Sequence, residues 1–256
     1  MDLDKLLYVS TYAGKILLEN GAEIYRVEDT ITRICYSYGV NTCDAFATPT
    51  GIMVSLYHNN NSASIVKRIT KRTVNLDKVH NINALSRSII SDSISLDNFY
   101  SLLNDIDKEP KYNSKILYFF SAISAGSFSI IFGGGLFDFI TSFIIGFVIS
   151  LTSESFRKLS INDFFKNYIC GGITAILALV AKQIGININF DSTIIGSIML
   201  LVPGLAITNA VRDIIAGDLL AGVTKVCEAI LVAIAIAVGI GSVLSFWISL
   251  LGGKIW

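Results

Sequence analysis

The strongest constraint on the fold of this chain is a series of long runs without charged residues in its second half. The runs cover residues 116–137, 139–153, 167–181, 192–211 and 229–253. A helix needs about 20 mostly apolar residues to cross a bilayer, so the two 15-residue runs must be extended by flanking residues. The sequence predicts an α-helical membrane protein with five transmembrane helices. The expected helices cover about residues 116–135, 137–155, 166–186, 192–209 and 226–250.

The first part of the chain has a different composition. Residues 1–115 make up less than half of the 256-residue chain. They hold 13 of the 20 Lys and Arg residues and 13 of the 20 Asp and Glu residues. This contrast predicts two domains, a small cytosolic α+β domain at residues 1–110 and a transmembrane domain at 111–256. The charged N-terminus, Met1-Asp-Leu-Asp-Lys5, does not read as a secretory signal, so we expect the first domain to stay in the cytosol.

Hydrophobic periodicity predicts the elements of the first domain. Apolar residues recur every three or four positions at 4–20, from Ile24 to Tyr38, at 76–91 and at 95–107, which favours helices. Residues 46–57 alternate and are rich in strand formers, and residues 64–69 return after a turn, so we expect one β-hairpin.

The distribution of basic residues predicts the orientation in the membrane. Basic residues precede the first span and lie in the loops after the second and fourth spans: Lys108, Lys111, Lys115, Arg157, Lys158, Lys166, Arg212 and Lys225. The opposite loops hold only Lys182, with Lys254 near the end. Because cytosolic loops are enriched in Lys and Arg, the N-terminus is predicted to be cytosolic.

The segment between the fourth and fifth expected spans is the main candidate for a transport site. Pro203-Gly204 should break the fourth span, because proline removes a backbone donor and clashes with the preceding turn. Charges begin at Arg212 in the amphipathic segment 211–224, and charges near a bilayer mark a pathway or an ion pair. The alternative is a short cytosolic loop with solvated charges. The candidate substrate and proton pathway residues are Pro203, Gly204, Asn209, Arg212, Asp213, Gly217, Asp218 and Glu228.

The polar face of the helix from Ile24 is a second candidate. It carries Glu23, Arg26, Glu28 and Asp29. These charges form either a solvated face with local ion pairs or a docking surface for the membrane domain or a partner.

Small residues recur four apart in the first and last spans. They are Ser121, Ala125 and Ser129, and Ala229, Ala233, Ala237 and Gly241. Such spacing lets helix backbones approach closely, either inside this chain or in a homo-oligomer.

Other classes of function find no support in the sequence. The cysteines form no metal-binding pair, the two histidines lack catalytic neighbours, and the net charge is zero. We therefore expect no metal, no cofactor, no nucleic acid and no enzymatic activity.

Three stretches resemble the bacterial threonine/serine exporter family. They are Gly21-Ala-Glu-Ile-Tyr-Arg-Val-Glu-Asp29, Phe46-Ala-Thr-Pro-Thr-Gly51, and Pro203-Gly204 with the downstream Asp213, Gly217 and Asp218. The chain is similar to the N-terminal part of that family, a cytosolic domain with five spans. Full-length members carry a second membrane half, so the resemblance implies a split exporter with a second, smaller membrane subunit.

The resemblance implies a multi-pass protein of the bacterial inner membrane that exports threonine, serine or a related small metabolite, driven by the proton gradient. Some split members are associated with dicarboxylates such as succinate, which keeps that substrate class open. The alternative from a different class is a non-transporting regulatory or scaffold subunit, whose spans only anchor the cytosolic domain.

Overall fold

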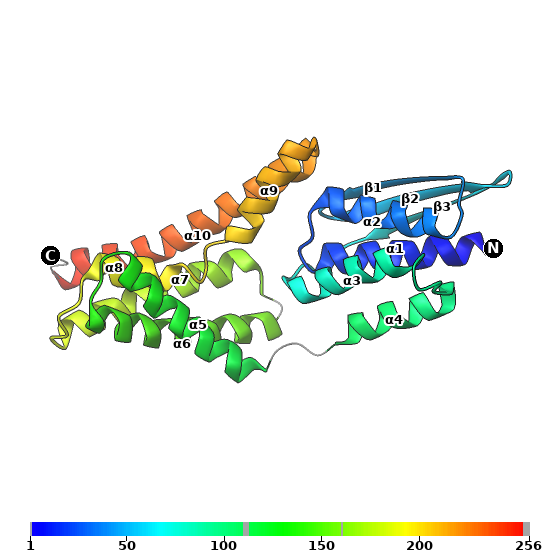
Figure 1. Ribbon diagram of the computed structural model, residues 1–256. Coiled ribbons are helices and arrows are strands. Elements are labelled where there is room, and N and C mark those ends of the chain that lie inside the picture. The colour runs from blue at the N-terminus through cyan, green and yellow to red at the C-terminus, as the bar shows by residue number, and fades with distance from the viewer. Residues whose placement is uncertain (1, 110–112, 160, 253–256) are drawn as a thin grey trace. The chain divides into compact units, whose positions relative to one another are not determined.

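The computed structural model describes residues 2–109, 113–159 and 161–252, and it divides the chain into two compact units (Figure 1). The first unit combines Met1–Pro110 with Leu205–Cys227, and the second combines Lys111–Gly204 with Glu228–Trp256. The first unit therefore contains the polar segment around Asp213 as well as the N-terminal residues.

Four helices of the first unit follow the predicted periodicity. They are α1 (Leu3–Glu19), α2 (Ile24–Ser37), α3 (Leu76–Ser88) and α4 (Leu96–Lys108). Asp2, Asn75 and Ser95 cap α1, α3 and α4, because each side chain accepts a hydrogen bond from a backbone N–H of the first turn. Gly39 ends the α2 region with a φ of 84°, a conformation that glycine adopts without strain.

The sheet of the first unit has three strands, where the sequence predicted a hairpin of two. The strands β1 (Thr42–Thr48), β2 (Gly51–His58) and β3 (Asn61–Arg68) pair antiparallel in that order. The expected strand at 46–57 was wrong, because Pro49 and Thr50 form a tight turn between β1 and β2. The buried positions change from odd numbers in β1, at Cys43 and Ala47, to even numbers in β2, at Ile52, Val54 and Leu56.

The helices α1 and α2 pack against one face of the sheet and form the core of the first unit (Figure 1). Ile16, Leu17, Ile31 and Ile52 are fully buried there. A Cβ on Gly14 would come within 2.4 Å of the Ile31 side chain, so α1 and α2 approach too closely for a larger residue.

The second unit contains most of the long apolar helices. They are α5 (Ser114–Ile131), α6 (Leu136–Lys158) and α7 (Asp163–Gln183), followed by the short α8 (Phe190–Ile198). The chain then continues into α9 (Gly204–Ala216) and α10 (Leu219–Leu251). Within the described residues, four helices are long and apolar enough to cross a membrane: α5, α6, α7 and α10.

The expected fourth span at 192–209 is not one helix. It is divided between α8 and α9, with a turn at 199–203, and neither helix reaches the length of a span. The break falls at Pro203, as the helix-breaking chemistry of proline predicts. The predicted count of five spans is therefore not confirmed. The last expected span, 226–250, begins earlier, because α10 starts at Leu219.

Small residues make the close helix contacts of the second unit. Ala125 and Ser129 of α5 are buried, and a Cβ on Gly146 of α6 would come within 2.6 Å of the Ala125 Cβ atom. In α10 the packing uses Ala235 and Gly239, since a Cβ on Gly239 would lie 2.1 Å from the Tyr168 carbonyl oxygen. Ala233 and Ala237, two members of the predicted stripe in this helix, are exposed.

Candidate functional site

The segment Leu205–Cys227, called here the elbow, consists of most of α9, a turn, and the first two turns of α10. Gly217 lies in the turn with a φ of 99°. The Asp218 N–H bonds to the Asp213 carbonyl at 2.8 Å, and the Gly217 N–H bonds to the Ile214 carbonyl at 3.1 Å. These two bonds close the C-terminus of α9 in a Schellman motif, for which a left-handed glycine is the usual residue.

A second glycine brings the two arms of the elbow together. A Cβ on Gly222 would lie 2.4 Å from the Ile214 side chain and 2.8 Å from the Ala210 carbonyl oxygen. The backbones of α9 and α10 therefore approach closely at this point, as the small residue at position 222 predicts.

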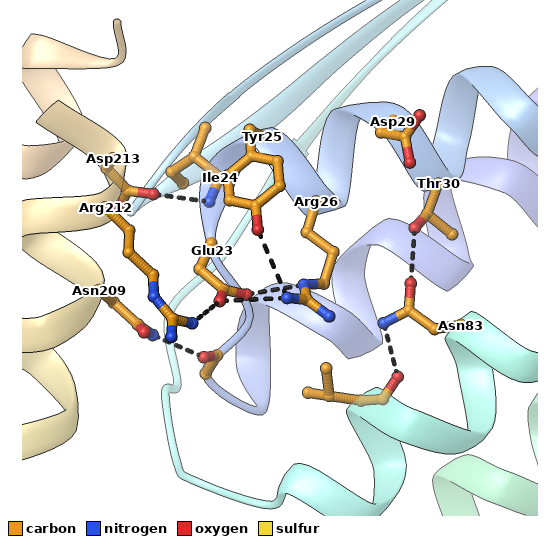
Figure 2. Close-up of polar contacts among 12 residues, drawn as sticks. Glu23, Ile24, Tyr25, Arg26, Asp29, Thr30, Asn83, Asn209, Arg212 and Asp213 are labelled. Carbon is orange, nitrogen blue, oxygen red and sulfur yellow. Dashed lines mark hydrogen bonds and ion pairs between the residues drawn. The ribbon is translucent and has the colours of Figure 1, made fainter. Parts of the chain in front are cut away.

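Side chains of α9 bind the start of α2, as Figure 2 shows. The Asn209 amide donates to the Gly21 carbonyl at 2.9 Å. The Asp213 carboxylate accepts from the Ile24 N–H at 3.1 Å. Ile24 is the first residue of α2, so this carboxylate satisfies a backbone donor that the helix leaves free and faces the positive end of the helix dipole.

Asp213 also forms a buried ion pair. Its other carboxylate oxygen lies 2.6 Å from the Lys225 ammonium nitrogen on α10. Asp213 is fully buried and Lys225 is 8% exposed. A buried charge is tolerated only when it is paired and hydrogen-bonded, so Asp213 and Lys225 require each other.

Glu23 joins two arginines. Its carboxylate lies 2.7 Å from Arg212 Nη1 and 2.8 Å from Arg26 Nε (Figure 2). Burial alone would raise the pKa of Glu23, but hydrogen bonds from its own N–H, from Arg212 and from Arg26 outweigh it and lower the pKa. Glu23 occupies the N-cap of α2 without capping it, because its carboxylate is used by the arginines.

Two further carboxyl groups lie near this cluster and behave differently. Burial raises the pKa of Glu28, which accepts a hydrogen bond from the Ala47 N–H at 2.7 Å and is repelled by Asp218 and Asp213. Burial and the charge of Asp213 also raise the pKa of Asp218, against the opposing effect of Lys225. Both groups therefore hold a proton more readily than an exposed carboxyl group does.

Asp218 borders a cavity of about 190 Å³. One wall is the strand segment Phe46–Thr48 of β1, and the other is the turn and first residues of α10, Gly217–Ala221. Two of the stretches that carried the family resemblance thus meet at one cavity, although they are about 170 residues apart in the chain. A cavity of this size has room for a small metabolite or several waters, since one water occupies about 30 Å³ in the liquid.

Four of the predicted site residues lie outside the group of polar side chains around Asp213. Pro203 and Gly204 belong to the second unit, where Pro203 precedes α9 and Gly204 begins it. Glu228 lies one turn beyond Lys225 on α10 and also belongs to the second unit. Asp29 pairs with Arg33 on the exposed side of α2. Asp29 therefore forms a local ion pair, which was one of the two alternatives for this helix face. Glu23 instead binds Arg212 of α9.

Sequence reasoning missed several groups that complete the cluster. Lys225 was noted only as a charge of the segment, and its partner could not be known without the hairpin of α9 and α10. The N–H groups of Ile24 and Ala47 carry no side-chain signal at all.

In the second unit, Asp138 was also missed. It is buried and accepts hydrogen bonds from the N–H of Gly135 and Asn189, both at 2.7 Å, and from the Thr193 hydroxyl at 2.8 Å. Its signal was its position as the one charge between two long apolar runs. In the part of the chain that the structure describes, no group of His, Cys, Asp and Glu residues could hold a metal ion.

A polar α+β unit joined to four long apolar helices defines a multi-pass membrane protein. The model of the family described as "Putative threonine/serine exporter" matches residues 9–247. The chain therefore belongs to the threonine/serine exporter family. The comparisons with curated proteins and with solved structures gave no significant match.

Proposed function

We propose that this chain is the subunit of a proton-coupled secondary exporter of threonine, serine or a related small metabolite. The observation that carries the proposal is the position of Asp218. This carboxyl group has a raised pKa and borders the 190 Å³ cavity in the elbow that follows the broken helix. Broken helices beside clustered charges are typical of transporter sites.

The charged groups of the cluster divide into two proposed roles. Asp213 is held by Lys225 and by the Ile24 N–H, so we assign it the role of fixing the elbow. Asp218 and Glu28, whose pKa values are both raised, are the proposed proton carriers. A carboxyl group that holds its proton more tightly in a partly buried place can release it when substrate or water enters.

A zwitterionic substrate needs a donor for its carboxylate and an acceptor for its ammonium group. Asp218 supplies the acceptor when it is ionised. Arg212 is the proposed donor, because its side chain stays 56% exposed while Nη1 is bound to Glu23.

Efflux from cells loaded with labelled threonine tests the proposal. We expect Asp218→Asn to abolish proton-coupled efflux, because the amide group has no titratable proton and no negative charge. The matched control is Asp29→Asn, which changes an exposed carboxylate of the same domain. Efflux at the wild-type rate from Asp218→Asn would remove this residue from the mechanism. Competition by unlabelled serine and succinate distinguishes the amino-acid and dicarboxylate classes.

The second candidate is a regulatory or scaffold subunit that does not transport. Three elbow side chains make structural contacts with the N-terminal residues instead of facing a substrate: Asn209, Arg212 and Asp213. This use of polar side chains favours the scaffold. We also propose a second, smaller membrane subunit, because the family resemblance lies in the N-terminal part of full-length members. Flux into liposomes that contain this chain, with or without that subunit, supports transport; no flux in either preparation supports the scaffold.

A further inference from the structure

A second cavity lies in the first unit, between α1 and the edge strand β3. It measures about 70 Å³ and is lined by Tyr8, Thr11, Tyr12, Lys15, Ile65 and Lys67. The four residues from α1 share one helix face, because they are spaced by three or four positions. None of them belongs to the elbow or to the cluster around Asp213.

A buried hydroxyl group at this cavity lacks a partner. Thr11 is 2% exposed, and its Oγ1 atom has no hydrogen-bond partner among the described residues. A threonine inside a helix commonly bonds to the carbonyl four residues earlier. Here that acceptor, the Leu7 carbonyl, is used by the neighbouring Ser10 hydroxyl at 3.2 Å. An unsatisfied buried hydroxyl is costly, so the Thr11 hydroxyl is a donor that a ligand can satisfy.

Two lysines, Lys15 and Lys67, line the same cavity as Thr11. Lys67 is on the same side of β3 as Ile65, which packs against the core below α1, because side chains alternate along a strand. Lys15 lies 3.7 Å from the Glu19 carboxylate, which is longer than a hydrogen bond, and 5.8 Å from the Tyr12 ring centroid. Lys15 is therefore in a long ion pair with Glu19 rather than in a direct hydrogen bond.

The aromatic walls favour a small ligand over a large one. Tyr8 and Tyr12 stack with ring centroids 6.2 Å apart, and the Tyr12 hydroxyl donates to Asp107 at 2.7 Å. The Tyr12 ring is therefore fixed, and its hydroxyl proton is not offered to the cavity. The space between the rings and β3 accommodates a group of about the size of two waters, at about 30 Å³ each.

We propose that this cavity binds the carboxylate group of a small organic anion, with the Thr11 hydroxyl donating to it and Lys15 and Lys67 supplying the positive charge. The site is independent of the proposed export function, because it shares no residue with the elbow. A carboxylate fits better than a larger anion, since a single buried donor and two flexible ammonium groups match its two oxygens.

Saturation-transfer NMR with acetate on the purified full-length chain tests the site. We expect transfer to acetate from the wild-type protein, and its loss in Thr11→Val and in Lys67→Met. Losing a hydrogen bond to a charged group weakens binding by about tenfold or more, which removes a weak ligand from detection. Thr11→Ser keeps the hydroxyl group and should keep the transfer, which separates loss of binding from misfolding.

The matched control is Arg68→Met, which removes a cation from the adjacent position on the opposite side of β3. This variant should bind acetate as the wild type does. The proposal is overturned if the wild type shows no transfer, if both Thr11→Val and Lys67→Met keep it, or if only inorganic phosphate is bound. Acetate binding retained in Asp218→Asn would show that this site stands even where the export function fails.

Discussion

Asp213 is the residue on which the contacts of the elbow converge. Its two carboxylate oxygens bind groups from two different elements, the Ile24 N–H of α2 and the Lys225 ammonium of α10. Because the carboxylate is fully buried, its removal leaves a buried cation without a partner. Asp213 is therefore more sensitive to substitution than any exposed acidic residue of this unit.

We predict that Asp213→Asn destabilises the protein by about 3–5 kcal/mol, the usual cost of breaking a buried pair by removing one partner. The double variant Asp213→Asn/Lys225→Met should recover much of the loss, because it removes the unpaired charge. Thermal unfolding in detergent measures both effects. Asp29→Asn, at an exposed pair, serves as the control and should change stability by less than about 1 kcal/mol. Equal stability of the single and double variants would contradict the pairing.

Glu23 gives a prediction about pH. Its pKa is lower in the folded protein than the ordinary value of 4.5, so the ionised carboxylate stabilises the fold. This contribution is complete above about pH 4.5 and is lost as the pH falls through the folded-state pKa. The melting temperature of the wild type should therefore exceed that of Glu23→Gln near neutral pH, and the difference should shrink below about pH 4.5. A difference that grows on acidification would be evidence against the ion pairs with Arg212 and Arg26.

At the scale of elements, the elbow is a hairpin of two helices whose geometry is set by glycines. Gly217 provides the left-handed turn, and Gly222 provides the close approach of α10 to α9. The same hairpin places Lys225 opposite Asp213 and turns Asp218 towards the cavity. A change in the distance between α9 and α10 should therefore disturb the ion pair and the cavity together.

We predict that Gly222→Val destabilises the protein by about 1–3 kcal/mol, the usual cost of overpacking a close contact. The added side chain would meet Ile214 and the Ala210 carbonyl. Gly241→Val is the control in the same helix. Among the described residues, a Cβ added at Gly241 has no atom within 4 Å apart from its chain neighbours and the nearby backbone of α10 itself. The melting temperatures of the two variants decide the matter, and equal values would show that α9 and α10 do not pack as described.

At the scale of the whole molecule, the short helix α8 raises the question of how the chain crosses the membrane. The elbow packs with the N-terminal residues in one compact unit, so both should lie on the same side of the bilayer. With the predicted orientation, the end of α7 lies on the opposite side. Nine residues of α8 rise only about 14 Å, against a hydrocarbon thickness of about 30 Å.

We predict that residues 188–204 cross the bilayer as an interrupted segment. Single cysteines at Ser62, Asn187 and Ile215 test this in a Cys227→Ser background, because the other three cysteines are buried. A membrane-impermeant maleimide applied to intact cells should label Asn187→Cys alone. Ser62→Cys and Ile215→Cys should react only after lysis. Labelling of Ile215→Cys from outside would place the elbow on the wrong side and exclude five crossings.

The sequence by itself determined the long apolar helices, the helices of the first domain and the break at Pro203, because each depends on a local pattern or on proline chemistry. It also indicated the family through Gly21–Asp29 and the residues after Pro203. Only the tertiary structure decided that Glu23 binds Arg212, that Asp213 pairs with Lys225, and that β1 reverses at Pro49. These features depend on groups that are far apart in the chain or on backbone N–H groups, and neither leaves a periodic signal in the amino-acid sequence.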